Sequence, residues 1–216
     1  MFLKERERIM LSNRLMKHFG AAAAAAVVVG SANAAIVHSG TLNFVCAIDI
    51  DGTYINVETN QLTNGPGSTV PGWDVNPYRS STGSGLNFFN PAGGGMVGST
   101  TTSAPITLAG GTLIGASSVF SSSTASTVFG AAAGNWQYGT TNIVGFRFVA
   151  SAGTTHYGWM RFLIGAQPAT GNLVTRTVVD FAYENVAGGS IEAGVIPAPG
   201  ALALLGLAGL AARRRR

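Results

Sequence analysis

Apolar and polar residues alternate along the middle of the chain, and this period of two predicts β-strands. The clearest stretch is residues 42–58, in which every second residue before a turn is apolar. Those positions are Leu42, Phe44, Cys46, Ile48 and Ile50. Asp51-Gly52 follows, a strong signal for a two-residue hairpin turn, and the alternation continues through Ile55 and Val57. Such a turn places all of these apolar side chains on one face, so the pattern predicts a hairpin over 42–58.

A second stretch with this pattern, residues 142–164, predicts another hairpin. The favoured register places Phe146 opposite Gly158 and Trp159 opposite Gly145, and aromatic rings that cover cross-strand glycines stabilise sheets. The same register puts four side chains on the other face, where arginines can stack on aromatic rings. These four are Arg147, Tyr157, Trp159 and Arg161.

The remaining predicted strands are shorter. One is expected over 173–183, with Leu173, Val179, Phe181 and Tyr183 on one side. Weaker patterns lie near 104–108, 112–120, 126–130 and 135–138. Residues 60–98 contain four prolines and a glycine run, which predicts a long functional or mobile loop. Short strands, Gly-rich turns and no convincing helix predict an all-β fold, an antiparallel β-sandwich or jelly-roll-like domain over 35–194.

The charge distribution excludes one class of partner. The 216 residues carry a net charge of +4, but nine of the 13 basic residues lie in the first 17 or the last four positions. Between residues 35 and 200 there are four arginines, seven acidic residues and no lysine, a net charge of −3. A nucleic-acid-binding domain needs a basic patch to neutralise phosphates, so no nucleic-acid partner is predicted. Charged residues are only 10% of the chain, unlike the composition of helical bundles.

Residues 1–34 have the three parts of a secretory signal peptide. A basic region is followed by an alanine-rich apolar run, and Ala32 and Ala34 occupy the small-residue positions that signal peptidase requires. Cleavage is expected after Ala34, with translation starting at Met1 or Met10. A buried alanine-rich helix is the alternative. The combined pattern favours export across the inner membrane by the general secretion machinery.

Residues 195–216 combine a proline motif, a short apolar run and an arginine cluster. The motif is Pro197, Ala198, Pro199 and Gly200, and the cluster is Arg213, Arg214, Arg215 and Arg216. As a helix, the apolar run is roughly 20 Å long, whereas a bilayer core is about 30 Å thick. Such a run suits transient membrane insertion, with the arginines as a stop-transfer signal on the cytoplasmic side. An ordinary C-terminal anchor helix is the alternative.

In this three-part order, residues 195–216 resemble the PEP-CTERM sorting tail of Gram-negative bacteria, with Ala198 at the position of the central glutamate. The resemblance implies that exosortase, a membrane transpeptidase, recognises and removes the tail. The protein is then released to or attached at the cell surface, often in bacteria that make exopolysaccharide. Residues 72–78, 145–148 and 155–159 are similar to stretches of uncharacterised secreted proteins with the same tail, which implies a shared domain and no particular activity.

Motifs for catalysis are scarce. Cys46 is the only cysteine, so a disulfide or a cysteine-based zinc site within one chain is excluded, and its place on an apolar face indicates a core residue. Residues 93–98 match a G-x-G-x-x-G pattern, but neither a preceding strand nor a following helix is predicted. The lysine-free middle of the chain excludes a Walker-type loop there. Neither G-x-S-x-G nor H-E-x-x-H occurs, and no cofactor is expected.

Three groups of residues remain as candidate sites. Asp49 and Asp51 are a candidate calcium site, although turn formation explains the same pattern. His156 is a candidate for a hydrolytic site with a serine and Asp74 or Asp180. Four aromatic residues and one arginine form a candidate surface for stacking on sugar rings. These are Trp73, Tyr78, Tyr157, Trp159 and Arg161.

Together these patterns predict an exported, non-enzymatic protein of the cell surface or extracellular matrix. Its expected partners are the secretion machinery, signal peptidase, an exosortase-type transpeptidase and extracellular polysaccharide. A carbohydrate-binding secreted domain and a secreted hydrolase are the alternatives. The first alternative requires exposed aromatic side chains, and the second requires a histidine in contact with a nucleophile.

Overall fold

The computed structural model describes residues 35–79, 85–169 and 173–196, and this part of the chain is all-β. Every pairing between its strands is antiparallel, and its one helical segment is a single 3₁₀ turn, η1 (Gly67–Thr69). The predicted all-β antiparallel class is therefore confirmed. The predictions for 1–34 and 197–216 lie outside the described residues. Within the described residues, no helix has the length and apolar character needed to cross a membrane.

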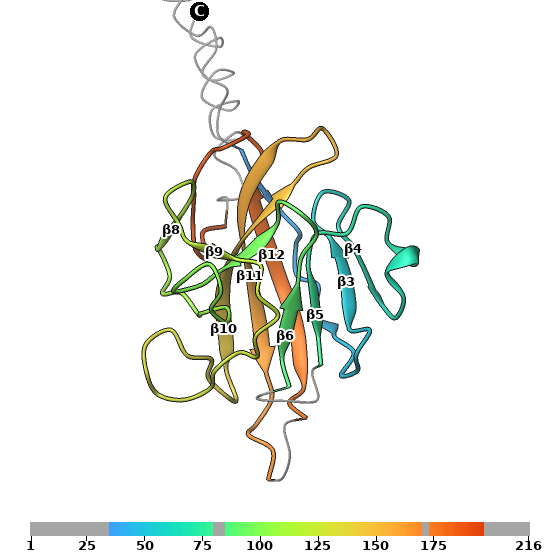
Figure 1. The fold of residues 1–216 in the computed structure, drawn as a ribbon, viewed down its shortest axis with the longest axis vertical. Helices are drawn as coiled ribbons and strands as arrows, with labels where there is room; N and C mark the ends of the chain where they lie inside the picture. Colours follow the sequence, from blue (N-terminus) through green and yellow to red (C-terminus); the bar gives the residue numbers. More distant parts are fainter. Residues whose placement is uncertain (1–34, 80–84, 170–172, 197–216) are drawn as a thin grey trace, which may run out of the picture. The chain divides into compact units, whose positions relative to one another are not determined.

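The largest sheet has seven strands and contains the longest strands of the described residues (Figure 1). The strand order is β1-β12-β11-β10-β7-β9, and β2 also pairs with β12. The bounds are β1 Ile36–His38, β2 Phe44–Val45, β7 Gly95–Val97, β9 Phe120–Ser121, β10 Thr141–Val149, β11 Thr155–Ile164 and β12 Arg176–Glu184. Alternate side chains of the long strands enter two different cores, one on each face.

The β10–β11 hairpin has the predicted register, since Phe146 pairs with Gly158 and Gly145 pairs with Trp159. A Cβ added to Gly158 would lie 2.5 Å from the Phe146 ring and 2.6 Å from the carbonyl oxygen of Ala182, so the ring covers this glycine as predicted. The prediction that the Trp159 ring covers Gly145 is wrong. The side chains closest to Gly145 are those of Val97, Leu108 and Ile114 rather than the indole of Trp159.

Substituting Gly158 by alanine is expected to lower the free energy of unfolding by about 1–3 kcal/mol, because the added methyl overlaps a fixed ring and a backbone oxygen. Gly110→Ala is the matched control, since a Cβ there meets nothing within 4 Å. Urea unfolding of the two variants measures the difference. Equal midpoints would contradict this account of how the hairpin packs.

Four short strands cover one face of the large sheet (Figure 1). They form two hairpins, β3–β4 and β5–β6, joined by a bridge between Ile55 and Val75. The bounds are β3 Thr53–Asn56, β4 Gln61–Asn64, β5 Asn76–Tyr78 and β6 Asn87–Phe89. Ile55 and Phe88 of these strands share the main core with Phe146 and Phe162 of the large sheet. The core therefore lies between the two groups of strands.

A smaller core covers the opposite face of the large sheet. β8 (Leu113–Ile114) and β13 (Ile191–Glu192) pair with each other over this face. Ile114 and Ile191 share a cluster with Phe120 and Trp159 of the large sheet. Because both faces of the sheet are covered, an aromatic residue on either face of a central strand is buried.

The hairpin predicted over 42–58 is wrong, because β2 pairs with β12 and β3 pairs with β4. Asp51-Gly52 does bend the chain: Gly52 has a φ of +69°, and its N–H donates to Asp49 Oδ1 at 2.7 Å. The bend leads from the large sheet to the short strands, and Ile50 is 77% exposed beside it. β2 pairs instead with an edge of β12, which lies far away in the sequence, so a local turn signal does not reveal this partner.

β12 departs from strict alternation. Its register against β11 shifts by one residue, which leaves Val179 as the extra residue of a bulge. Val178 and Phe181 consequently both belong to the main core. The predicted apolar side is therefore wrong at two positions, since Leu173 is 51% exposed and Val178 takes the core position expected for Val179.

The long loop predicted over 60–98 is also wrong, because this stretch contains β4, β5, β6 and β7. Each of these strands has three or four residues, which is too short to show a period of two in the sequence. The weak pattern near 112–120 corresponds to β8 and the first residue of β9. The other weak patterns are reduced to isolated bridges, such as the one between Phe129 and Trp136.

Candidate functional site

The side chains proposed to form a ligand surface do not lie together. Tyr157 is 7% exposed and Trp159 is fully buried, because the β8 and β13 segments cover their face of the sheet. The ligand surface predicted for these two residues is therefore wrong. Arg161 stacks over Trp159 at 5.5 Å, which confirms the predicted cation–π contact, whereas Arg147 stacks on Phe120 at 5.0 Å.

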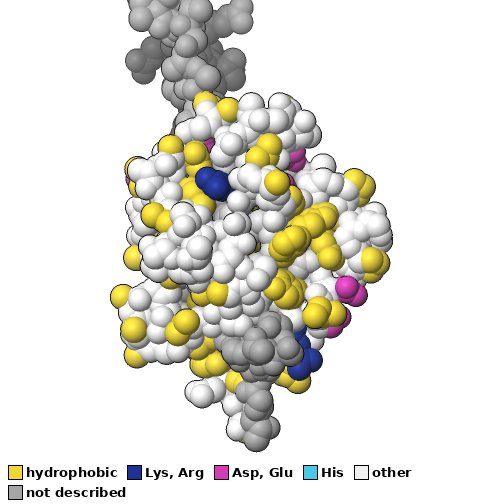
Figure 2. Space-filling view, viewed as in Figure 1, with side chains coloured by type: hydrophobic (Ala, Val, Ile, Leu, Met, Phe, Trp, Pro, Cys, Tyr) yellow, Lys and Arg dark blue, Asp and Glu magenta, His cyan; other side chains and the backbone are white. Residues whose placement is uncertain are grey.

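Trp73 is partly exposed and lies in a surface cluster of aromatic rings. Its ring centroid is 5.0 Å from that of Tyr54 and 5.7 Å from that of Phe89, which is 48% exposed. Tyr54 comes from β3, Phe89 ends β6, and Trp73 precedes β5. Figure 2 shows apolar side chains gathered over β3 and β5 on this side, with few charged groups around them. Tyr54, Trp73 and Phe89 form the aromatic platform.

The turn that carries Trp73 is held by β3. Asn56, at the end of β3, donates from Nδ2 to the carbonyl oxygens of Pro71 at 2.8 Å and Gly72 at 3.0 Å. Gly72 has a φ of +66°, in the left-handed region that favours glycine. The buried amide group of Asn56 and the left-handed conformation of Gly72 therefore fix the position of Trp73, and neither depends on a bound ligand.

A small pocket of about 170 Å³ opens beside the aromatic platform. Its lining residues are Gly72, Trp73, Asp74, Pro91, Ala92, Gly94, Phe148 and Val149. Asp74 is the one charged residue in this lining. The volume is smaller than the roughly 300–1,000 Å³ of pockets that enclose a drug-sized ligand, so the pocket suits one substituent or the edge of one ring.

Asp74 is a buried carboxyl group with 5% of its surface exposed. Burial raises the pKa of Asp74 to about 7, the hydrogen bond from Val57 N to Oδ2 at 2.8 Å opposes this increase, and the charge of Glu58 adds to it. Glu58 itself accepts hydrogen bonds from the N–H of Ser151 at 2.7 Å and from its hydroxyl at 3.2 Å. Near neutral pH, the Asp74 carboxyl is present in both protonation states, so it can donate or accept a hydrogen bond.

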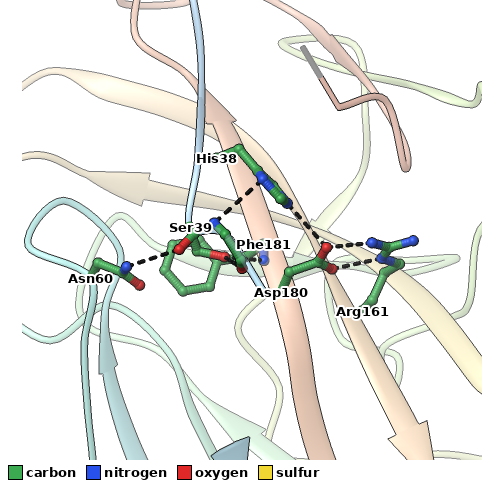
Figure 3. Close-up of polar contacts among 7 residues, drawn as sticks. His38, Ser39, Asn60, Arg161, Asp180 and Phe181 are labelled. Carbon is green, nitrogen blue, oxygen red and sulfur yellow. Dashed lines mark hydrogen bonds and ion pairs between the residues drawn. The ribbon is translucent and has the colours of Figure 1, made fainter. Parts of the chain in front are cut away.

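A second polar cluster lies beside β1 (Figure 3). Asp180, whose side chain is 1% exposed, accepts hydrogen bonds from Arg161 Nε at 2.6 Å and from Arg161 Nη2. His38 Nε2 lies 3.0 Å from Asp180 Oδ2. Burial raises the pKa of Asp180, but the hydrogen bonds and charges of Arg161 and His38 outweigh burial and hold this pKa below its ordinary value. Sequence reasoning missed the cluster, since His38 and Asp180 are 142 residues apart.

The hydrolytic site proposed around His156 is not assembled in this structure. His156 Nε2 lies 2.9 Å from Thr154 Oγ1, and Nδ1 lies 2.8 Å from the carbonyl oxygen of Glu184. The ring also stacks on Phe148. Both nitrogens therefore have partners other than a serine or an aspartate, and Asp180 pairs with His38 instead.

Ser39 follows His38 but is not its hydrogen-bond partner (Figure 3). The Ser39 hydroxyl donates to Gly40 O at 2.8 Å and accepts from Phe181 N at 3.0 Å, while Asn60 Nδ2 donates to Ser39 O at 3.1 Å. A nucleophilic serine needs a base within hydrogen-bond reach. The contacts around His38 instead tie β1 to β12.

The candidate calcium residues serve the turn in this structure, since Asp49 Oδ1 accepts the Gly52 N–H. Among the described residues, no three side chains of His, Cys, Asp or Glu lie close enough together to hold a metal ion. Cys46 is buried as predicted, and burial raises the pKa of its thiol. Tyr78 is outside the pocket lining, and its carbonyl oxygen accepts a hydrogen bond from the buried Arg176 at 2.9 Å.

Comparison of the chain with known protein families, with curated proteins and with solved structures gave no match. A functional proposal therefore rests on the sequence and on the geometry of the described residues. In that geometry the candidate site is the pocket beside the aromatic platform, because an apolar surface and one titratable carboxyl group meet there.

Proposed function

We propose that the chain is an exported, non-enzymatic protein of the cell surface or extracellular matrix, built on one β-sandwich domain. The observation that carries this proposal is the position of two targeting patterns, 1–34 and 195–216, on either side of a lysine-free domain. The secretion machinery and signal peptidase act on the first, and an exosortase-type transpeptidase acts on the second. The sandwich arrangement is supported by the core that lies between the large sheet and strands β3 to β6.

The contacts of the two histidines among the described residues, His38 and His156, support the non-enzymatic part of the proposal. His38 is engaged by Asp180 and by the N–H of Gly40, and His156 by Thr154 and a backbone carbonyl. A general base needs a ring nitrogen that can reach a substrate or a nucleophile. In both residues the ring nitrogens are used in contacts within the fold.

Intact mass of the protein recovered from the surface and the medium of the native host tests this proposal. The expected species begins at Ala35 and ends between Pro197 and Gly200, with or without an added group at the new C-terminus. A species that retains Arg213–Arg216 in the membrane fraction would contradict sorting by cleavage and would identify the tail as a simple anchor.

A second candidate function is carbohydrate binding, and the aromatic platform favours it. Sugar rings present apolar C–H faces that stack on aromatic side chains, and hydroxyls that hydrogen-bond to carboxyl groups. Trp73 supplies a partly exposed ring, and Asp74 supplies a carboxyl in the same pocket. Polysaccharide is also the partner expected of a surface or matrix protein, so the two candidate functions are compatible.

Binding to a panel of oligosaccharides, including those of the native host, tests the second candidate. Trp73→Ala is expected to weaken binding roughly tenfold or more, as is usual when a central aromatic anchor is removed. Leu113→Ala is the control, because Leu113 is a 61% exposed apolar residue outside the pocket lining. Absence of binding by the unmodified protein, or equal binding by Trp73→Ala, would overturn carbohydrate recognition at this site.

A further inference from the structure

The electrostatic character of the pocket restricts the ligands that it can take. Its lining contains one acidic residue, Asp74, and no lysine, arginine or histidine. The charge that acts on Asp74 from nearby is that of another carboxylate, Glu58. A ligand with its own carboxylate would therefore meet like charges, whereas a ligand with a positive group would meet opposite charge.

The Asp74 carboxyl is held in place but is not fully hydrogen-bonded. Its backbone N–H donates to Ile55 O at 2.7 Å, and its carbonyl oxygen accepts from Asn90 Nδ2 at 3.0 Å. Oδ2 accepts from Val57 N, but Oδ1 has no hydrogen bond to any residue that the structure describes. A buried carboxylate with a vacant acceptor is costly, and a cationic donor relieves that cost more than a neutral one does.

Trp73 adds a second feature that suits a cation. Its indole lies in the same lining as Asp74, and the indole face attracts cations through its π-electrons. An ammonium group in the pocket would thus lie near both an indole ring and a carboxylate. The small volume, about 170 Å³, leaves room for an amine substituent while the rest of a sugar ring stacks on the exposed part of the platform.

We propose that this pocket selects saccharides that carry a free ammonium group, such as a hexosamine unit that is not acetylated. Trp73 stacks on the sugar ring, and Asp74 Oδ1 accepts a charge-assisted hydrogen bond from the ammonium group. An N-acetyl group removes the positive charge, and a uronic acid introduces a negative one, so both are disfavoured. This inference rests on carbohydrate binding as proposed above and assigns the class of sugar.

Titration calorimetry at pH 7 with four oligosaccharides of equal length tests the inference. The probes are oligomers of glucosamine, N-acetylglucosamine, glucose and glucuronic acid. The glucosamine oligomer is expected to bind roughly tenfold more tightly than the glucose oligomer, because a charge-assisted hydrogen bond is about twice as strong as a neutral one. The N-acetylglucosamine and glucuronic acid oligomers are expected to bind no better than glucose.

Two variants that each remove one acidic group separate a specific contact with Asp74 from a general attraction between the protein's negative charge and the ammonium groups. Asp74→Asn is expected to bring the ratio of the dissociation constants for the glucose and glucosamine oligomers from roughly tenfold to about one, whatever its effect on the affinity for either oligomer. Asp51→Asn, at an exposed acidic position outside the pocket lining, is expected to keep the preference. Loss of the preference in both variants would overturn the role of Asp74.

The outcomes also separate this inference from the function on which it rests. If neutral and cationic oligomers bind equally and Trp73→Ala abolishes both, the site is saccharide-binding but the preference for an amine is overturned. If none of the four oligomers binds, and no saccharide of the wider panel binds, carbohydrate recognition itself fails. Tighter binding of the glucuronic acid oligomer would contradict the electrostatic argument directly.

Discussion

Arg161→Met is expected to lower the free energy of unfolding by about 3 kcal/mol at pH 7. The reason is that Asp180, with a side chain 1% exposed, would lose its arginine partner and keep only the His38 ring, at 3.0 Å. Because the folded-state pKa of Asp180 is depressed, this stabilisation is present above the unfolded pKa of about 3.9 and is lost as pH falls below it. Urea unfolding at pH 7 and pH 3 should show the difference between the two proteins narrowing in acid.

Arg147→Met is the matched control for this substitution. Arg147 lies on the same face of the sheet and stacks on Phe120, but it has no ion pair with any described residue. Its loss is expected to cost about 0.5–1 kcal/mol, the value of a cation–π contact, with little dependence on pH. If the two substitutions cost the same, or if the Arg161→Met difference persists unchanged at pH 3, the buried ion pair does not contribute as described.

Asp74→Asn is expected to have the opposite effect to Arg161→Met. It should raise the free energy of unfolding by about 2–4 kcal/mol at pH 8. The folded-state pKa of Asp74 is raised from its ordinary value to about 7, chiefly by burial. Its contribution to stability is therefore fully present below the unfolded pKa of about 3.9 and is lost as pH rises through about 7. Asparagine keeps an acceptor for the Val57 N–H but cannot ionise.

The measurement is the free energy of unfolding of both proteins between pH 4 and pH 8. The curves should lie close together near pH 4 and diverge as pH rises, with the unmodified protein losing stability. Asp180→Asn provides a second comparison, because it is expected to destabilise at pH 7. Parallel curves for Asp74→Asn and the unmodified protein would show that Asp74 does not ionise in a buried environment.

The loss of stability that is expected when Asp74 ionises bears on function. Perturbed pKa values cluster at binding and catalytic sites, and Asp74 lines a pocket beside partly exposed aromatic rings. The stability lost when Asp74 ionises is what a cationic ligand would restore. The free energy of unfolding and the affinity for oligosaccharides therefore both test the ionisation of the Asp74 carboxyl group.

Secondary structure was predictable where the pattern and its partner are close in the chain. The β10–β11 hairpin was predicted with its register, because both strands are long and alternation on one constrains the other. The hairpin over 42–58 had an equally strong turn signal at Asp51-Gly52 and was wrong. The difference is that Phe44 and Val45 find a partner in β12, more than 100 residues later, and no local pattern contains that information.

The candidate site was also only partly predictable from the sequence. Trp73 was among the side chains proposed to contact a ligand, and it lies in the pocket lining. The sequence offers Asp74 only as a partner of His156, because nothing in the sequence shows that Asp74 is buried. Trp159 is fully buried because β8 and β13 fold over it, and strands of two residues each have no recognisable pattern.

The all-β class and the longest hairpin can be inferred from the sequence alone. The targeting patterns at 1–34 and 195–216 also rest on the sequence alone, and they stay predictions. These features depend on the order and spacing of neighbouring residues. The folded chain is needed to show which aromatic rings reach the surface, which histidine contacts Asp180, and that Asp74 lies in a pocket with Trp73. Burial and pairing are properties of segments that lie far apart in the chain, and they are settled only when both faces of the sheet are covered.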